Sequence, residues 1–352
     1  MSHSAVLTAK GQYVSISDAL HTSSESHKRQ GQVKRLDAQT HCPVESLQLA
    51  LRWSFNEQIR RKFKFPMARQ KMKKLAALII GFFMALSCSA EPILIEEKLD
   101  RTQGVFIKNP VYIRALAWMP EEKADTVILY FNGWPSISRI ENDKTFFNGI
   151  NRFIRVSMFL KENVGVVLMD CPTDQWGIKS WDVPTACDDS YRSSKQHVQD
   201  IERVIKFLKE SHAIKNFYLM GHSHGTISAK LLGKAMAQDV AGVISSAAVT
   251  LRYKGAVSNF GWAGENFNMD DLKIPVLNIH HEEDGCWPTP YATVLKYSKN
   301  NLITVQGGIK NGPVCGGGNY HSYEGNEIEI NKAIIKWIQS REVTPYVGLK
   351  NN

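Results

Sequence analysis

Most of this chain lacks an excess of charge of either sign. The 352 residues carry a formal net charge of +9, but residues 1–74 hold 14 Lys and Arg against 5 Asp and Glu and account for all of it. Residues 91–352 are balanced. A domain without net positive charge has no electrostatic basis for binding a phosphate backbone, so we expect no nucleic-acid partner.

Apolar runs long enough to cross a bilayer are also missing. The candidate, Leu75–Leu86, has 12 residues, whereas a spanning helix needs roughly 20. Basic residues precede it and small residues follow it before Glu91, which predicts a secretory signal at 72–90. We therefore expect an exported protein, periplasmic or secreted, with no stable membrane span after cleavage. Residues 1–71 are then either disordered or an upstream extension of the gene model, unless they form a tail on a signal anchor.

Glycine loops that bind phosphate are absent, and there is no internal repeat. Gly316-Gly317-Gly318 lacks the Lys and the helix that would have to follow it in a P-loop. Cysteine is scarce: beyond residue 90 there are four, Cys171, Cys187, Cys286 and Cys315. An even number in an exported chain permits two disulfides, in any of three pairings.

Short apolar runs alternate with amphipathic segments through residues 91–345. Runs such as Thr126–Phe131 and Val164–Met169 are typical of strands buried on both faces of a parallel sheet, and 194–210 has a helical apolar face. The alternation predicts one α/β domain, with a mostly parallel sheet and helices on both faces. The loops at 173–192 and 250–272 are too short for a large cap domain, so we expect none. Further strands are expected at 93–99, 104–107, 111–118, 217–220, 240–249, 274–280 and 302–305, helices at 143–161, 227–237, 291–297 and 325–338, and a tail at 346–352.

The stretch Phe217–Thr226 organises the rest of the chain. An apolar run ends in Gly-His-Ser-His-Gly, and a helix-compatible segment follows at once. This is the strand, sharp turn and helix of a nucleophile elbow, with Ser223 at its tip. Gly221 and Gly225 flank the serine, where a Cβ would clash as strand and helix close together. We therefore expect Ser223 to be a nucleophile.

A serine nucleophile needs a base, and the base needs a carboxylate. In this fold the chain order is Ser, acid, His. Asp284 follows the strand predicted at 274–280 and precedes a glycine, which suits a tight loop; Glu282 and Glu283 are alternatives. His321 is the one histidine after Asp284 and lies just before the last predicted helix. We expect Asp284 and His321 as the acid and the base.

The cysteine positions favour one of the three pairings. Cys286 lies two residues after Asp284, and Cys315 lies six residues before His321. A Cys286–Cys315 disulfide would tie the acid loop to the base loop, leaving Cys171 to pair with Cys187. In the loop-entropy account, a ring of about 30 residues stabilises the fold by roughly 3–4 kcal/mol.

An acyl transfer also needs two N–H donors for the oxyanion. One is the backbone N–H of His224, which follows the nucleophile; the other is expected from the turn after Thr126–Phe131, at Trp134. Trp134, Trp176, Trp181, Trp262 and Trp287 lie near predicted strand ends and are candidates for lining an acyl site or for ordinary packing.

One other chemistry and two other roles compete with this interpretation. A zinc site of the His-x-His-x-Asp-His type would need Asp at position 226, which is Thr, so we expect no metal and no cofactor. A non-catalytic binding protein on the same fold would have no use for Ser, His and Asp together. A membrane-tethered scaffold would depend on residues 1–71 rather than on these side chains.

Residues 110–342 resemble the α/β-hydrolase superfamily, and more narrowly a group of exported bacterial α/β-hydrolases of undefined substrate. The narrower resemblance rests on His280-His281-Glu282-x-Asp284-Gly285-Cys286, the late Cys315, and His321-x-x-x-Gly325-x-Glu327 before a helix ending near Trp337. It implies Ser223, Asp284 and His321 as triad and Trp134 and His224 as oxyanion donors. Asn132 departs from the His frequent at its position.

The resemblance fixes the mode of attack and leaves the substrate open. We expect a serine hydrolase that cleaves a carboxylic ester or related acyl bond of a small molecule through an acyl-enzyme. A peptidase on the same fold is the alternative. Nothing in the sequence predicts the oligomeric state.

Overall fold

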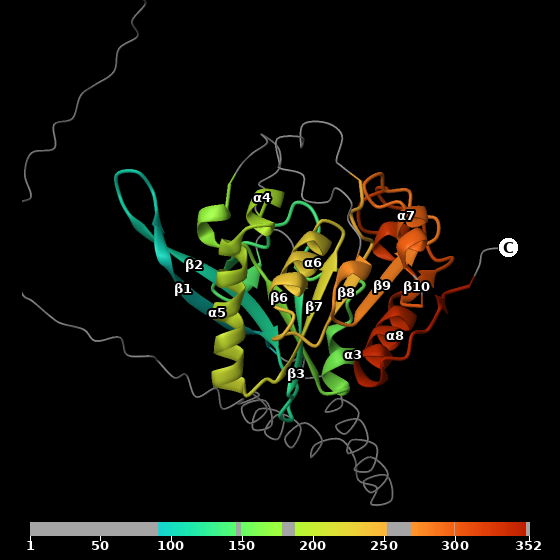
Figure 1. The fold of residues 1–352 in the computed structure, drawn as a ribbon, viewed down its shortest axis with the longest axis horizontal. Helices are drawn as coiled ribbons and strands as arrows, with labels where there is room; N and C mark the ends of the chain where they lie inside the picture. The colour runs from blue at the N-terminus through green and yellow to red at the C-terminus, as the bar shows by residue number, and fades with distance from the viewer. Residues whose placement is uncertain (1–90, 146–148, 178–186, 252–268, 299, 350–352) are drawn as a thin grey trace, which may run out of the picture. The chain divides into compact units, whose positions relative to one another are not determined.

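The computed structural model describes residues 91–145, 149–177, 187–251, 269–298 and 300–349 (Figure 1). The regions expected to be an upstream extension (1–71) and a signal (72–90) lie outside these ranges, as do parts of both loops on which the absence of a large cap depends. Within the described ranges, no helix is both long enough and apolar enough to cross a membrane.

One nine-stranded sheet forms the centre of the domain, in the order β1-β2-β6-β3-β7-β8-β9-β10-β11. β1 and β2 form an antiparallel hairpin, β2 pairs antiparallel with β6, and every later pairing is parallel. The strands are β1 Ile93–Gln103, β2 Asn109–Trp118, β3 Thr126–Phe131, β6 Val164–Met169, β7 Asn216–His222, β8 Gly242–Ser246, β9 Val276–His281, β10 Leu302–Val305 and β11 Tyr346–Val347. The predicted α/β class and mostly parallel sheet are confirmed.

Helices cover both faces of this sheet (Figure 1). One apolar layer includes side chains of α5 Lys195–His212, α6 Gly225–Ala235 and α7 Tyr291–Tyr297. The opposite layer includes side chains of α3 Val156–Lys161 and α8 Glu327–Ser340. The short helix α4, Asp189–Arg192, and three single turns, η1 Thr173–Gln175, η3 Met269–Asp271 and η4 Tyr320–Ser322, lie in the connections.

Three predicted segments differ from the structure. Residues 104–107 are the exposed end of the β1–β2 hairpin instead of a strand. The helix expected at 143–161 begins only at Val156, and a small hairpin, β4 Ile140–Glu141 with β5 Lys144–Thr145, precedes it. The expected tail at 346–352 opens with β11, which pairs with β10 and so extends the sheet.

The turn between β7 and α6 is packed backbone against backbone. A Cβ on Gly225 would lie 2.0 Å from the carbonyl oxygen of Phe131 at the end of β3. A Cβ on Gly221 would lie 2.3 Å from the carbonyl oxygen of Gly225. Ser223 between them has a φ of 52°, a left-handed conformation that side chains disfavour. The predicted need for two glycines therefore has a steric basis.

We expect Gly225→Ala to lower the free energy of unfolding by about 3 kcal/mol or more, because the added methyl group meets fixed backbone atoms rather than a side chain that can rotate. Urea unfolding measures the loss. Gly317→Ala is the matched control: nothing lies within 4 Å of its added Cβ, so we expect a change below about 0.5 kcal/mol. Equal effects of the two substitutions would contradict the packing argument.

Candidate active site

The carboxyl ends of the parallel strands bring the predicted site residues to one edge of the sheet. Ser223 follows β7, Asp284 follows β9, and His321 lies in η4 after β10. The loop of residues 132–138 follows β3, between β6 and β7 in the sheet. Ligands of open α/β sheets bind at this edge, so the chain delivers these groups to the expected place.

Ser223 is held by its backbone on both sides of the turn. Its N–H donates to the carbonyl of Ser246 at 2.9 Å, which ties the turn to the end of β8. Its own carbonyl accepts from the N–H of Thr226 at 3.0 Å and from the Thr226 hydroxyl at 2.6 Å. Thr226, at the position where a zinc hydrolase would need Asp, therefore serves the turn.

Asp284 and His321 are in direct contact. The distance from His321 Nδ1 to Asp284 Oδ2 is 2.9 Å, and the two side chains are 3% and 0% exposed. Of the three acids considered, Asp284 is the one whose carboxylate contacts His321; Glu282 instead accepts from Gln306 at 2.9 Å. An imidazole whose Nδ1–H faces a buried carboxylate has its tautomer fixed, leaving Nε2 to accept a proton.

Several donors hold the carboxylate of Asp284 in its charged form. The Cys286 N–H donates to Oδ1 at 2.9 Å, and the Thr289 hydroxyl donates to Oδ2 at 2.9 Å. His280 Nε2 lies 3.3 Å from Oδ2. Burial alone would raise the pKa of Asp284, but its contacts with His280 and His321 outweigh burial, and the pKa is below its usual range. The acid is therefore ionised at neutral pH.

His222 packs beside His321 as a neutral imidazole. Its ring centroid is 5.1 Å from that of His321, and its Nδ1 lies 3.0 Å from the Ser246 hydroxyl. Burial lowers its pKa well below 6.5, with a further contribution from His321. Tyr323, with its hydroxyl 3.0 Å from Ser246 Oγ and donating to the carbonyl of Ile279 at 2.9 Å, closes this network. We did not predict Thr289 or Tyr323, because neither carries a sequence signal of a role.

Two disulfides border the site. Cys286–Cys315 joins the loop of Asp284 to the segment before His321, and Cys171–Cys187 joins the end of β6 to the start of α4. These are the pairs that the sequence favours.

The loop after β3 lies against Ser223. A Cβ on Gly133 would be 3.0 Å from the Cβ of Ser223. Next to it, the Trp134 ring contacts the His224 ring edge to face, with centroids 6.2 Å apart. The backbone N–H groups of Trp134 and His224 thus belong to two segments that meet at Ser223. Trp181 and Trp262, also candidates for an acyl site, lie outside the described residues.

The His224 side chain has hydrogen-bond partners that we did not predict from the sequence. Its Nδ1 lies 2.6 Å from Ser136 Oγ, and its Nε2 lies 2.6 Å from Asp189 Oδ1. All three residues are buried. The only sequence signal for Asp189 is its position two residues after Cys187, and Ser136 has none.

No group of three or more His, Cys, Asp or Glu in the described ranges is arranged to hold a metal ion. His222 and His280, which lie at strand ends where a zinc site would need imidazoles, have other partners. His222 contacts Ser246, and His280 Nε2 donates to the carbonyl of Thr289 at 2.8 Å.

Comparisons with known proteins add a family match. Residues 189–311 match the family described as serine aminopeptidase, S33; the matched part includes Ser223 and Asp284 and ends before His321. No curated protein matches the chain.

Three solved structures illustrate what the chain is similar to. Est1E from Butyrivibrio proteoclasticus is 15% identical over 70% of this chain and 98% of that one, with a TM-score of 0.45. XC6422 from Xanthomonas campestris, an a/b serine hydrolase without lid, is 13% identical over 72% and 95%, with a TM-score of 0.41. Pyrococcus horikoshii acylaminoacyl peptidase is 13% identical over 73% and 42%, with a TM-score of 0.43.

Buried neutral histidines make the stability of the fold dependent on pH. Burial lowers the pKa of His197, His222 and His224 below 6.5. Below pH 6.5 the unfolded chain therefore binds protons at these positions that the folded chain does not. The free energy of unfolding should then fall as pH falls from 6.5 towards 5, by up to about 1.4 kcal/mol per pH unit for each such histidine.

Replacing one of these histidines isolates its share. We expect His197→Phe, away from the proposed nucleophile, acid and base, to reduce that slope by up to about 1.4 kcal/mol per pH unit. Urea unfolding of both proteins at several pH values between 7 and 5 measures it. An unchanged slope would show that His197 titrates alike in the folded and unfolded states.

Proposed function

We propose that this serine hydrolase of the α/β-hydrolase superfamily cleaves a carboxylic ester through a triad of Ser223, His321 and Asp284. The observation that carries the proposal is the buried hydrogen bond between Asp284 and His321, formed at the same sheet edge as the strained turn of Ser223. A histidine–carboxylate hydrogen bond this well shielded from water needs a role for its imidazole, and a nearby serine hydroxyl supplies one.

The geometry implies the order of proton transfers. Asp284 accepts the Nδ1–H of His321, so Nε2 is free of a proton and takes the one on Ser223 Oγ. Oγ then forms a bond to the carbonyl carbon of the ester, and the carbonyl oxygen becomes an oxyanion. His321, now charged beside Asp284, returns its proton to the departing alcohol. Water attacks the acyl-enzyme in the same way and releases the acid and Ser223.

The N–H groups of Trp134 and His224 are our candidates for holding the oxyanion. Trp134 lies in the loop that contacts Ser223 through Gly133, and His224 opens the helix behind it. Two donors fixed in advance stabilise the charge that develops during attack without reorganising. Among the described residues, no hydrogen bond joins Ser223 Oγ to His321; such contacts tighten in many hydrolases only when substrate is bound.

A peptide bond is the second candidate substrate. The observation in its favour is the match of residues 189–311 to the serine aminopeptidase family. The two reactions share the attack by Ser223 and differ in the leaving group, an alcohol or an amine. The amine is the poorer leaving group, so a peptidase depends more on proton return from His321. Without a large cap, small or extended acyl groups are the substrates we expect.

We expect the purified protein to react covalently with a fluorophosphonate probe and the Ser223→Ala variant not to. The probe reports an activated serine and needs no knowledge of the natural acyl group. Mass spectrometry of the labelled peptide identifies the serine. Hydrolysis of p-nitrophenyl butyrate should fall by at least ~10³-fold in the same variant.

Two further results separate the triad from its rivals. Asp284→Asn should slow labelling, because the amide no longer stabilises a charged His321. Failure of the folded, oxidised native protein to label would favour a non-catalytic binding protein instead. A panel of p-nitrophenyl esters and amino-acid p-nitroanilides, assayed with the native protein, distinguishes esterase from peptidase.

We also propose that the protein is exported after cleavage of the segment 72–90. Both disulfides in the described part of the chain are of the kind that persists in oxidising compartments. N-terminal sequencing of the native protein should find a chain that begins near Glu91. A chain that begins at Ser2 would contradict cleavage and favour a tethered protein.

A further inference from the structure

The side chain of His224 forms hydrogen bonds whose direction can be worked out. Burial lowers the pKa of His224, although the bond to Asp189 opposes the shift, so the ring is neutral and carries one N–H. The carboxylate of Asp189 can only accept, so this N–H is on Nε2. Nδ1 must then accept, and the hydroxyl of Ser136, 2.6 Å away, must donate to it. Ser136 therefore donates to His224, and His224 donates to Asp189.

These three residues belong to three separate segments. Ser136 lies in the loop after β3, two residues beyond Trp134, and its N–H donates to the carbonyl of Gly133 at 2.8 Å. Its φ of 64° is a conformation that the surrounding bonds must maintain. His224 opens α6, and Asp189 opens α4. The His224 ring therefore connects the loop that carries Trp134 to the segment that follows Ser223.

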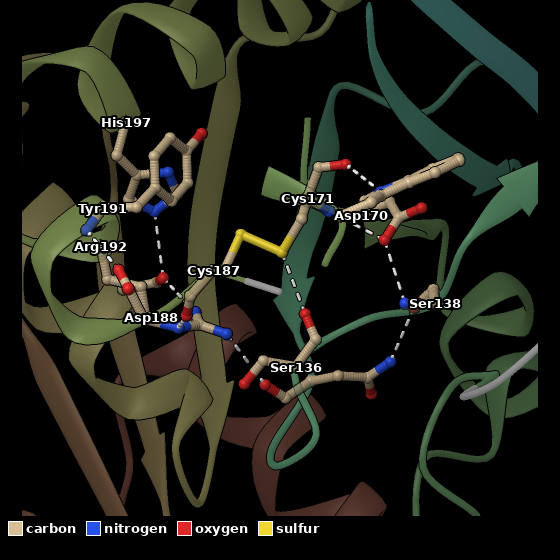
Figure 2. Close-up of a disulfide and its surroundings, with 12 residues drawn as sticks. Ser136, Ser138, Asp170, Cys171, Cys187, Asp188, Tyr191, Arg192 and His197 are labelled. Atoms are coloured by element: carbon tan, nitrogen blue, oxygen red, sulfur yellow. Dashed lines mark hydrogen bonds between the residues drawn. A yellow bond between two sulfur atoms is a disulfide. The ribbon is translucent and has the colours of Figure 1, made fainter. Parts of the chain in front are cut away.

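A disulfide joins the Asp189 segment to Cys171, a residue that contacts the Ser136 loop. Cys187 comes two residues before Asp189, and its partner Cys171 has its sulfur 3.0 Å from the carbonyl oxygen of Ser136 (Figure 2). Next to Cys171, the Asp170 carboxylate accepts the N–H of Ser138 at 3.0 Å. The contacts thus run in a closed ring from Ser136 through His224, Asp189 and the disulfide back to Ser136.

Arg192 fastens α4 to the helix behind the nucleophile. Its Nε donates to the carbonyl of Cys187 at 2.8 Å, and its Nη1 donates to the hydroxyl of Ser228 in α6. Figure 2 shows Arg192, Tyr191 and His197 on one side of the disulfide, with Ser138 and Asp170 on the other. Contacts on both sides of Asp189 therefore hold it in position.

We propose that Asp189, His224 and Ser136 are positioning residues that align the two oxyanion donors, and that the Cys171–Cys187 disulfide holds Asp189 in this arrangement. The inference rests on the proposed function, because it concerns the N–H groups of Trp134 and His224. The ring of His224 fixes its own backbone and, through Ser136, the loop of Trp134. Donors held at a set separation stabilise the transition state more than the bound ester.

The test compares kcat and KM for p-nitrophenyl butyrate. Asp189→Ala should lower kcat by about 10- to 100-fold, less than the 10²–10³ that loss of a whole donor costs, and should change KM by less than about twofold. Affinity for a trifluoromethyl ketone, which adds to the serine and forms an oxyanion, should fall in parallel with kcat. Asp189→Asn, whose amide oxygen still accepts from Nε2–H, should retain most of the activity.

Four further variants test the result. Ser136→Ala should also lower kcat selectively, and it tests the proposal even if Asp189→Ala fails to fold. Asp174→Ala is the control. Asp174 lies in the same connection between β6 and α4, but its carboxylate pairs with Arg101, so its loss should leave kcat unchanged. Replacing both Cys171 and Cys187 with Ser should lower kcat, and adding Asp189→Ala should then cost less than it does in the native chain.

The outcomes separate this inference from the function on which it rests. If the native protein neither labels with the fluorophosphonate nor hydrolyses the ester, both are wrong. If it does both, but Asp189→Ala and Ser136→Ala change only stability or KM, the triad stands and the positioning role is wrong. Selective loss of kcat and of ketone affinity, restored by Asn at 189, supports the role.

Discussion

Contact between backbones at the turn of β7 into α6 is the constraint on which the site depends. Gly225 lies against the carbonyl of Phe131, and Gly221 lies against Gly225, so neither position has room for a side chain. Ser223 lies between them at a φ of 52°. The same closeness brings the loop after β3 to Ser223 and places His224 at the start of α6. Sterics at two glycines therefore fix the positions of both the proposed nucleophile and one candidate oxyanion donor.

Buried polar groups supply the second level of organisation. The side chain of Asp284 is buried and accepts from a backbone N–H, a threonine hydroxyl and an imidazole. Asp189 and Asp170 are likewise buried, each beside one half-cystine of the Cys171–Cys187 pair. Unpaired charges of this kind would cost several kcal/mol each, so each demands a defined set of donors. This need for specific donors explains how the loops of the site are held in defined positions.

Sequence patterns predicted the elements whose apolar residues are continuous in the chain. The bounds of β3, β6, α7 and β10 agree with the structure, because a buried parallel strand or a short amphipathic helix is specified locally. The segment before α3 was predicted as helix because its phenylalanines recur at helical spacing. Phe153 is indeed buried, but its carbonyl accepts from Asn331 of α8, 178 residues away. A distant side chain has taken the place of the helical hydrogen bond.

The residues of the site likewise divide into those that the sequence predicts and those that it does not. Ser223, Asp284 and His321 were predicted because the fold imposes their order and their positions after strands. Ser136 and Asp189 were not, because a serine in one loop and an aspartate in another carry no sign that a histidine ring lies between them. Contacts that depend on two loops meeting have no local pattern, and only the folded chain shows them.

The Cys286–Cys315 disulfide couples two loops, so that they move together. It joins the loop of Asp284 to the segment that ends at His321, and the acid and base are themselves hydrogen-bonded. Relative displacement within this pair is thereby suppressed, whereas Ser223 belongs to the rigid turn at the end of β7. The gap between Ser223 and the His321 ring is thus the separation in the proposed triad that neither the disulfide nor this hydrogen bond fixes. A substrate entering that gap would meet an acid–base unit that advances or withdraws as a whole.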